Sequence, residues 1–222
     1  MDKKGAMDPN TVIGKVLAVC VSKPKPVLYD GRTVMTGIFK TPVEGRLNLS
    51  RLNLDGDEQA DLTVHGGPDK AVYAYPSEHY PWWRSEWPDV DFPYGKFGEN
   101  LTTEGLLESD VYIGDEFQIG TAVLRVSQPR LPCYKLGIKF GRNDVIKKFV
   151  RSGRSGIYFS VVEEGELGAG DDIRYLRGDG LGIKVQDIAN LFKGGQPKDP
   201  DFLRRALDSN LAEQMKMFIA GH

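Results

Sequence analysis

Glycine and proline divide this chain into short segments, and that division constrains its fold more than any other feature of the sequence. The 222 residues include 26 glycines and 13 prolines, which favour turns and end regular elements. Between them, apolar and polar residues alternate at 13–21, 46–49 and 122–126, and alternation is typical of strands. The sequence therefore predicts a mainly β protein with many turns.

The charge balance and hydropathy narrow the class of protein further. The 29 basic residues nearly match the 31 acidic ones, which argues against nonspecific nucleic-acid binding. No apolar run is long enough to cross a bilayer. Residues 1–10 resemble an expression-tag remnant, and no apolar leader follows them, so we expect a cytoplasmic protein.

Several common chemical signatures are absent from the sequence. The two cysteines, Cys20 and Cys133, do not form the pattern of a disulfide framework, and the three histidines have no zinc-ligand spacing. There is no phosphate-binding loop, dinucleotide fingerprint, GxSxG elbow or HExxH helix.

The composition changes after residue 176, which divides the chain into two parts. We expect a β-rich domain at 11–176, a glycine-containing linker, and a C-terminal appendage at 183–222. Three short helices are predicted in the appendage, at 185–192, 201–207 and 211–219. Because so short an appendage buries little area alone, it should pack on the β-rich domain or on another protein, and a homodimer is one such arrangement.

The stretch SQPRLPCYK at 127–135 carries the most distinctive chemistry. It follows a predicted strand, its two prolines stiffen the backbone, and Cys133 lies between Arg130 and Lys135. Neighbouring cations favour the thiolate, which is the form that attacks electrophiles or binds metals. The alternative is a small buried side chain, and we assign that structural role to Cys20.

Four polar loops follow predicted strands elsewhere, at 40–42, 56–59, 65–70 and 97–100. Their glycines allow a ligand to approach the main chain, and successive backbone amides can bind anions. Taken singly, each loop is better explained as an ordinary turn.

Together these loops and the cysteine stretch resemble the MOSC domain family, and most closely its YiiM-like branch. The resemblance extends over roughly residues 12–176 and rests on the following motifs: GIFKTP at 37–42, LDGDEQ at 54–59, HGGPDKA at 65–71, YPSEHY at 75–80, FGENL at 97–101 and SQPRLPCYK at 127–135.

The resemblance implies a β-barrel with flanking helices, a C-terminal three-helix appendage and a pterin-bound molybdenum cofactor (molybdopterin). Cys133 would be the molybdenum ligand or a sulfur carrier, since thiolate suits such a metal. His65 would orient the metal's oxo group or move a proton, and Asp57 would act as an acid or base or bind the pterin. The remaining expected cofactor-binding residues are Lys40, Gln59, Gly66, Gly67, Lys70, Asn100, Gln128, Arg130 and Lys135.

The implied activity is detoxifying reduction of N-hydroxylated compounds, such as hydroxylaminopurine base analogues. Because the chain has no flavin, haem or iron–sulfur motif, the electrons would come from a partner protein. One alternative is a sulfur-transfer or cofactor-carrier protein with a persulfide on Cys133. Another is a noncatalytic interaction protein that uses the helical appendage.

Overall fold

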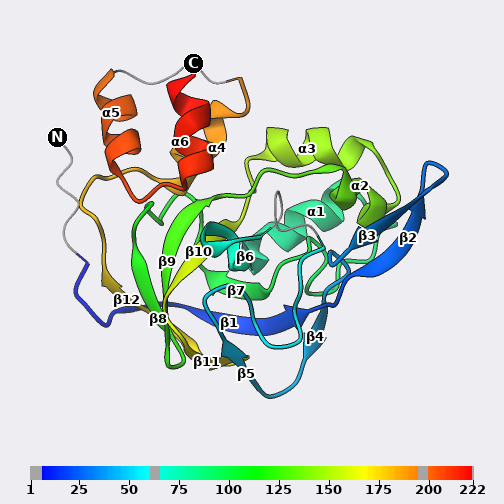
Figure 1. Ribbon diagram of the computed structural model, residues 1–222, viewed down its shortest axis with the longest axis horizontal. Helices are drawn as coiled ribbons and strands as arrows, with labels where there is room; N and C mark the ends of the chain where they lie inside the picture. Colours follow the sequence, from blue (N-terminus) through cyan, green and yellow to red (C-terminus); the bar gives the residue numbers. More distant parts are fainter. Residues whose placement is uncertain (1–6, 61–65, 195–199, 222) are drawn as a thin grey trace.

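A closed barrel forms the body of the protein (Figure 1). The computed structural model describes residues 7–60, 66–194 and 200–221. Among these, seven strands pair in the order β12-β8-β9-β10-β6-β7-β1, and a β1–β12 pairing closes the ring. All of these pairings are antiparallel except β6 with β7. The strands are β1 (Val12–Val21), β6 (Val72–Pro76), β7 (Leu101–Gly105), β8 (Glu116–Ile119), β9 (Ala122–Pro129), β10 (Ile157–Glu163) and β12 (Asp172–Arg177).

Strand β1 pairs with β12 on one side and with β7 on the other, and two facing glycines let β1 and β7 approach closely. A Cβ at Gly14 would lie 2.3 Å from the carbonyl oxygen of Glu104. At Gly105 it would lie 2.4 Å from the carbonyl oxygen of Ile13, and φ there is +78°. Only glycine tolerates both the contact and the backbone conformation.

Smaller strands flank the barrel. Strand β4 (Thr41–Val43) continues the sheet beside β1, and β5 (Arg46–Leu49) pairs with β11 (Gly165–Gly168). A separate hairpin, β2 (Lys25–Tyr29) with β3 (Arg32–Thr36), projects from the side of the barrel (Figure 1). Tyr29 of this hairpin lies 5.8 Å, centroid to centroid, from the ring of Tyr134.

Three helices cover one outer side of the barrel over an aromatic cluster. They are α1 (Tyr80–Glu86), α2 (Tyr134–Phe140) and α3 (Asp144–Ser152). Phe97 is fully buried at the centre of the cluster, stacked 4.3 Å from the ring of Tyr75. Because the cluster fixes the helices against the barrel, it forms a rigid base beneath Cys133, the residue before α2.

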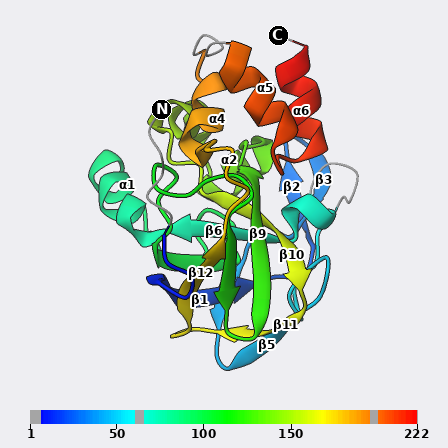
Figure 2. The same cartoon turned by 90° about the vertical axis from the view of Figure 1, so that its left-hand side faces the viewer.

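The C-terminal helices pack on the end of the barrel (Figure 2). They are α4 (Val185–Leu191), α5 (Pro200–Asp208) and α6 (Glu213–Ala220). Phe202, Met215 and Ile219 belong to the same apolar cluster as the barrel interior. The backbone N–H of Ala212 also donates to the carbonyl oxygen of Ser127 at 3.1 Å. The appendage therefore covers its own barrel.

The structure confirms the predicted fold class, a β-barrel with flanking helices and a three-helix appendage. The division into two domains stays a prediction. Of the tag-like residues, 1–6 lie outside the described part, whereas Met7 packs against the core and Asn10 donates its N–H to the carbonyl oxygen of Tyr175. None of the described helices has both the length and the apolar character to cross a membrane.

Candidate functional site

The end of β9 leads the chain to Cys133. Gln128 and Pro129 pair with Tyr158 and Ile157 of β10, after which the chain leaves the sheet. Cys133 precedes α2 in an extended conformation (φ −115°, ψ 172°), directly after Pro132, whose ring fixes its own φ. Its thiol is half-buried, between the exposed side chains of Leu131 and Tyr134. The sulfur is therefore held at a rigid strand end and remains within reach of a ligand.

Arg130 supplies a buried positive charge next to this thiol. Its guanidinium donates to the carbonyl oxygen of Phe97 and lies 4.6 Å from the centre of the Tyr73 ring. Burial opposes its charge, but the phenols of Tyr73 and Tyr158 and the Cys133 sulfur raise its pKa above the usual value. Arg130 is therefore always charged and favours an anion at Cys133.

Asp57, Lys40 and Asn100 form an interior network near Arg130. The Asp57 carboxylate is fully buried and accepts hydrogen bonds from Lys40 Nζ, from the Ser22 N–H at 3.0 Å and from Asn100 Nδ2 at 3.0 Å. Asn100 Oδ1 accepts from the Tyr73 N–H at 3.1 Å. Burial lowers the pKa of Lys40, against the pull of Asp57. These polar atoms are already engaged within the protein, so their direct contact with a cofactor stays a prediction.

Lys139, which no sequence motif singled out, joins the loops on this side of the barrel. Its amine, on α2, donates to the carbonyl oxygens of Ile38, Lys40 and Gly95. Burial lowers its pKa to about 7, although Glu99 acts in the opposite direction. A Cβ at Gly95, where φ is +83°, would lie 2.8 Å from the carbonyl oxygen of Lys40. Lys139 therefore holds the 38–40 and 95–97 loops in place.

Two polar side chains at the site have no partner in the described residues. Gln128 is buried and its Oε1 accepts no hydrogen bond, which is costly unless a ligand supplies a donor. Lys135 is 9% exposed as a residue, and its amine makes no hydrogen bond or ion pair to the described residues. An unsatisfied acceptor and a cation beside a thiol fit a phosphorylated heterocycle that binds a thiolate-ligated metal.

The glycine loop lies toward the appendage. Gly66 and Gly67 have positive φ angles, and the short helix η1 (Pro68–Lys70) follows them. Lys70 Nζ donates to Gln214 Oε1 of α6 at 2.9 Å. Ser127 Oγ donates to the carbonyl oxygen of Asp69, which ties the loop to β9.

Three expected site residues gain little support from the structure. His65 lies outside the described residues. Gln59 is half-buried with no hydrogen bond to another described side chain, and Lys70 points to α6. The structure thus brings together Cys133, Arg130 and Gln128, and the roles of all the predicted site residues stay predictions.

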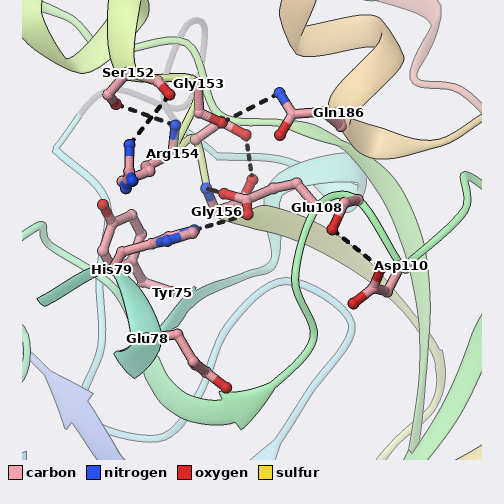
Figure 3. A network of polar contacts seen from close by, with 12 residues as sticks. Tyr75, Glu78, His79, Glu108, Asp110, Ser152, Gly153, Arg154, Gly156 and Gln186 are labelled. Carbon is pink, nitrogen blue, oxygen red and sulfur yellow. Dashed lines mark hydrogen bonds and ion pairs between the residues drawn. The ribbon is translucent and has the colours of Figure 1, made fainter. Parts of the chain in front are cut away.

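A polar network on the barrel fixes the start of β10 near the site (Figure 3). Glu108 is buried; its Oε1 accepts from the Gly156 N–H at 2.6 Å, and its Oε2 lies 2.8 Å from His79 Nε2. The N–H of Gln186 in α4 donates to the carbonyl oxygen of Glu108. The network links α4 to the strand that carries Tyr158.

A recess elsewhere in the described residues offers a weaker candidate site. This polar recess of about 230 Å³ lies between barrel and appendage, with Glu116, Arg125, Arg177 and Asp179 in its wall. It contains no predicted site residue. No group of three or more His, Cys, Asp or Glu side chains in the described part could hold a metal ion.

This chain is similar to one protein-family profile and to several known proteins. The MOSC domain profile matches residues 61–174. The uncharacterized protein YflK of Bacillus subtilis (strain 168) is 47% identical over 192 residues, which cover 86% of each chain. A protein named reductase, from Gibberella moniliformis (strain M3125 / FGSC 7600), is 38% identical over 171 residues, 76% of this chain but 30% of that one.

A solved structure agrees with the barrel and the appendage together. The crystal structure of YiiM from Geobacillus stearothermophilus superimposes with a TM-score of 0.78 at 31% sequence identity. The match covers 94% of this chain and 98% of that one. The likeness therefore includes the helices that pack on the barrel end.

Proposed function

Because this chain belongs to the YiiM-like branch of the MOSC domain family, we propose that it is a molybdenum-cofactor-dependent reductase of N-hydroxylated compounds. One observation carries the proposal. Cys133 is a half-buried thiol beside the buried guanidinium of Arg130, at a strand end where Gln128 Oε1 has no partner. This arrangement fits an anionic, nitrogen-rich ligand with a thiolate-seeking metal.

The residues at the end of β9 have complementary roles in holding the cofactor. Cys133 would hold the metal through its sulfur, which the charge of Arg130 favours as an anion. Gln128 Oε1 would accept a hydrogen bond from the heterocycle, and Lys135 would hold its phosphate. Asp57, Lys40 and Asn100 act indirectly, because their hydrogen bonds hold the surrounding loops.

When bound, the cofactor supplies the two-electron chemistry, and the protein positions the substrate and donates protons to it. The overall reaction is R–NHOH + 2e⁻ + 2H⁺ → R–NH₂ + H₂O. The aromatic cluster of Phe97, Tyr75 and Phe149 excludes water from the protein side of the site. Because water is excluded, the positive charge of Arg130 interacts more strongly with the reacting atoms.

Electrons must reach the site from outside this chain, which has no flavin, haem or iron–sulfur motif. In the fungal reductase, the segment similar to this chain is 30% of the length, so that protein has room for a separate electron-delivering module. We therefore assign the supply of electrons to a donor protein that docks near Cys133.

The decisive experiment is turnover by protein loaded with cofactor, with reduced viologen as donor and 6-hydroxylaminopurine as substrate. Wild-type protein should form the amine, and Cys133→Ala should form none. Cys20→Ala is the matched control, since Cys20 is fully buried and burial raises the pKa of its thiol to about 12. Turnover by Cys133→Ala would refute the assignment.

A second candidate function is sulfur transfer or cofactor carriage through a Cys133 persulfide. The exposed side chains of Leu131 and Tyr134 on either side of Cys133 favour it, because a sulfur-donor protein could reach the thiol there. Mass spectrometry of the protein as isolated distinguishes the two. A gain of one sulfur on Cys133 without molybdenum supports carriage, and bound molybdenum with an unmodified thiol supports reduction.

A further inference from the structure

A row of three side chains crosses neighbouring strands beside Cys133. Tyr158 of β10 lies directly opposite Gln128 of β9 and directly opposite Tyr73 of β6. Directly opposite residues in antiparallel strands point to the same face, and the two tyrosine rings are 5.0 Å apart. Arg130 lies over Tyr73 at 4.6 Å. The row therefore faces the loop that carries Cys133.

The hydrogen-bonding groups of the row are used unequally. The Tyr73 hydroxyl donates to the carbonyl oxygen of Ser155 at 2.8 Å and is thereby satisfied. By contrast, the hydroxyl of Tyr158 makes no hydrogen bond to another residue in the described ranges. Its neighbour in the row, Gln128, has the unsatisfied acceptor described above. The middle of the row thus presents an unused proton donor next to the place assigned to the cofactor.

The surroundings of Tyr158 suit a proton donor. Burial raises the pKa of its phenol, so the proton is present at neutral pH. The positive charge of Arg130 acts in the opposite direction and favours the phenolate, while the charges of Cys133 and Asp57 favour the protonated form. Arg130 can therefore stabilise the phenolate that remains after the proton has left.

The position of Tyr158 is fixed by bonds to its backbone. Ser127 Oγ lies 2.9 Å from the carbonyl oxygen of Tyr158 and shares its single proton between that oxygen and the carbonyl oxygen of Asp69. Two residues earlier, the Gly156 N–H donates to Glu108 (Figure 3). Since an acid catalyst must meet its substrate within hydrogen-bonding distance, such restraint is what the role requires.

We propose that Tyr158 is the catalytic acid of the site and donates its hydroxyl proton to the leaving oxygen of the N-hydroxylated substrate. This inference rests on the proposed function. The N–O bond breaks as nitrogen takes two electrons from the reductant, and the oxygen leaves as water. The Tyr158 phenolate then takes a proton from solvent, and a second solvent proton completes the amine.

Cleavage of the N–O bond requires an acid that protonates the leaving oxygen. Hydroxide is a poor leaving group, because water has a pKa of about 15.7, and protonation of the oxygen removes that barrier. A positioned general acid typically contributes about 100- to 10,000-fold to the rate.

The test compares Tyr158→Phe with Tyr73→Phe, which are identical changes at neighbouring positions in the row. In cofactor-loaded protein with reduced viologen and 6-hydroxylaminopurine, Tyr158→Phe should lower kcat by at least about 100-fold with little change in KM. Tyr73→Phe should lower the melting temperature, because its bond to Ser155 is lost, and keep kcat within about threefold. A Tyr158→Phe variant with kcat within threefold of wild type would overturn the proposal.

Two further readouts separate catalysis from a structural role. With the O-acetyl ester of the substrate, whose leaving group needs no proton, the loss in Tyr158→Phe should shrink to under about tenfold. In protein without cofactor, Tyr158→Phe should keep the melting temperature of wild type, because its hydroxyl makes no hydrogen bond to another described residue that would be lost. An equal loss on both substrates, or a melting temperature lowered as far as in Tyr73→Phe, would contradict the role.

These arms also distinguish failure of this inference from failure of the proposed function. If loaded wild-type protein does not reduce the substrate, the proposed function is wrong and Tyr158 has no leaving oxygen to protonate. If wild type is active and Tyr158→Phe equals it, only the acid assignment is wrong.

Discussion

Asp57 provides a sharp test of how this site is built, because the sequence suggests a chemical role whereas its carboxylate is bonded to three groups of the protein itself. Its carboxylate is fully buried and bonds to the buried amine of Lys40, to Asn100 and to the Ser22 backbone. Asp57→Asn keeps the shape of the side chain and removes its charge. The change leaves the Lys40 charge buried without a counter-ion.

The magnitude follows from burial. Only 9% of the Lys40 side chain and none of the Asp57 side chain is exposed. Loss of one partner from a buried ion pair costs about 3–5 kcal/mol. For a chain of this size, that loss should lower the urea midpoint by about 1–2 M. Adding Lys40→Met to Asp57→Asn should recover about half of the loss, since no unpaired charge then remains.

The assay is equilibrium urea unfolding followed by tryptophan fluorescence, with Glu58→Gln as the matched control. Glu58 is the next residue, and its ion pair with Lys23 has 55% and 74% of the two side chains exposed, so its loss should cost less than about 0.5 kcal/mol. If Asp57→Asn is within 1 kcal/mol of wild type but inactive, the reasoning fails and Asp57 acts in the chemistry.

Three further predictions follow from the same geometry. Burial lowers the pKa of Lys139 to about 7, so between pH 7 and 10.5 the unfolded chain holds a proton that the folded chain lacks. The free energy of unfolding should therefore rise by about 1 kcal/mol per pH unit above pH 7. In urea titrations at several pH values, Lys139→Met should flatten that rise. Gly95→Ala should cost at least about 2 kcal/mol by the same measurement, because the new Cβ would meet the Lys40 carbonyl oxygen at 2.8 Å in a left-handed conformation. Gln128→Leu should leave the cofactor-free protein as stable as wild type or up to about 1 kcal/mol more stable, since it removes an unsatisfied acceptor. It should also lower the pterin content of the loaded protein, and a strong loss of stability without cofactor would contradict the unpartnered state of Gln128 Oε1.

The strand pattern was largely predictable from the sequence, because strand alternation is a local signal. Strands expected at 13–21 and 46–49 occur at Val12–Val21 and Arg46–Leu49, and the three helices of the appendage lie within a few residues of their predicted bounds. The strand expected at 122–126 is also confirmed, although β9 continues through Pro129. Pro129 fits because it is the last residue of that strand.

Two elements at the site could not be predicted, for physical reasons. Helix α2 begins directly after Pro132 and Cys133 with no side-chain cap hydrogen bond, so the usual start signals are missing. Lys139, on that helix, therefore had no predicted place. Strand β2 contains Pro26, which suits the edge of an isolated hairpin but reads locally as a linker.

The role of Tyr158 depends on contacts that are distant in the sequence. In a buried strand a tyrosine is indistinguishable from ordinary core. Only the register with Gln128 and Tyr73 shows that it faces the Cys133 loop. In the same way, the sequence suggests that Asn100 reads a heterocycle, whereas in the structure its amide bonds to Asp57 and the Tyr73 N–H.

The central claim is that Cys133 and its neighbours bind a molybdenum–pterin cofactor, and metal and pterin analysis tests it most directly. Wild-type protein, Cys133→Ala and Cys20→Ala would be purified from a host that makes the cofactor. We predict about one molybdenum and one pterin per chain in wild type and Cys20→Ala, and little molybdenum in Cys133→Ala, because the thiolate ligand is lost. Wild-type protein without molybdenum, or Cys133→Ala with the full amount, would contradict the claim.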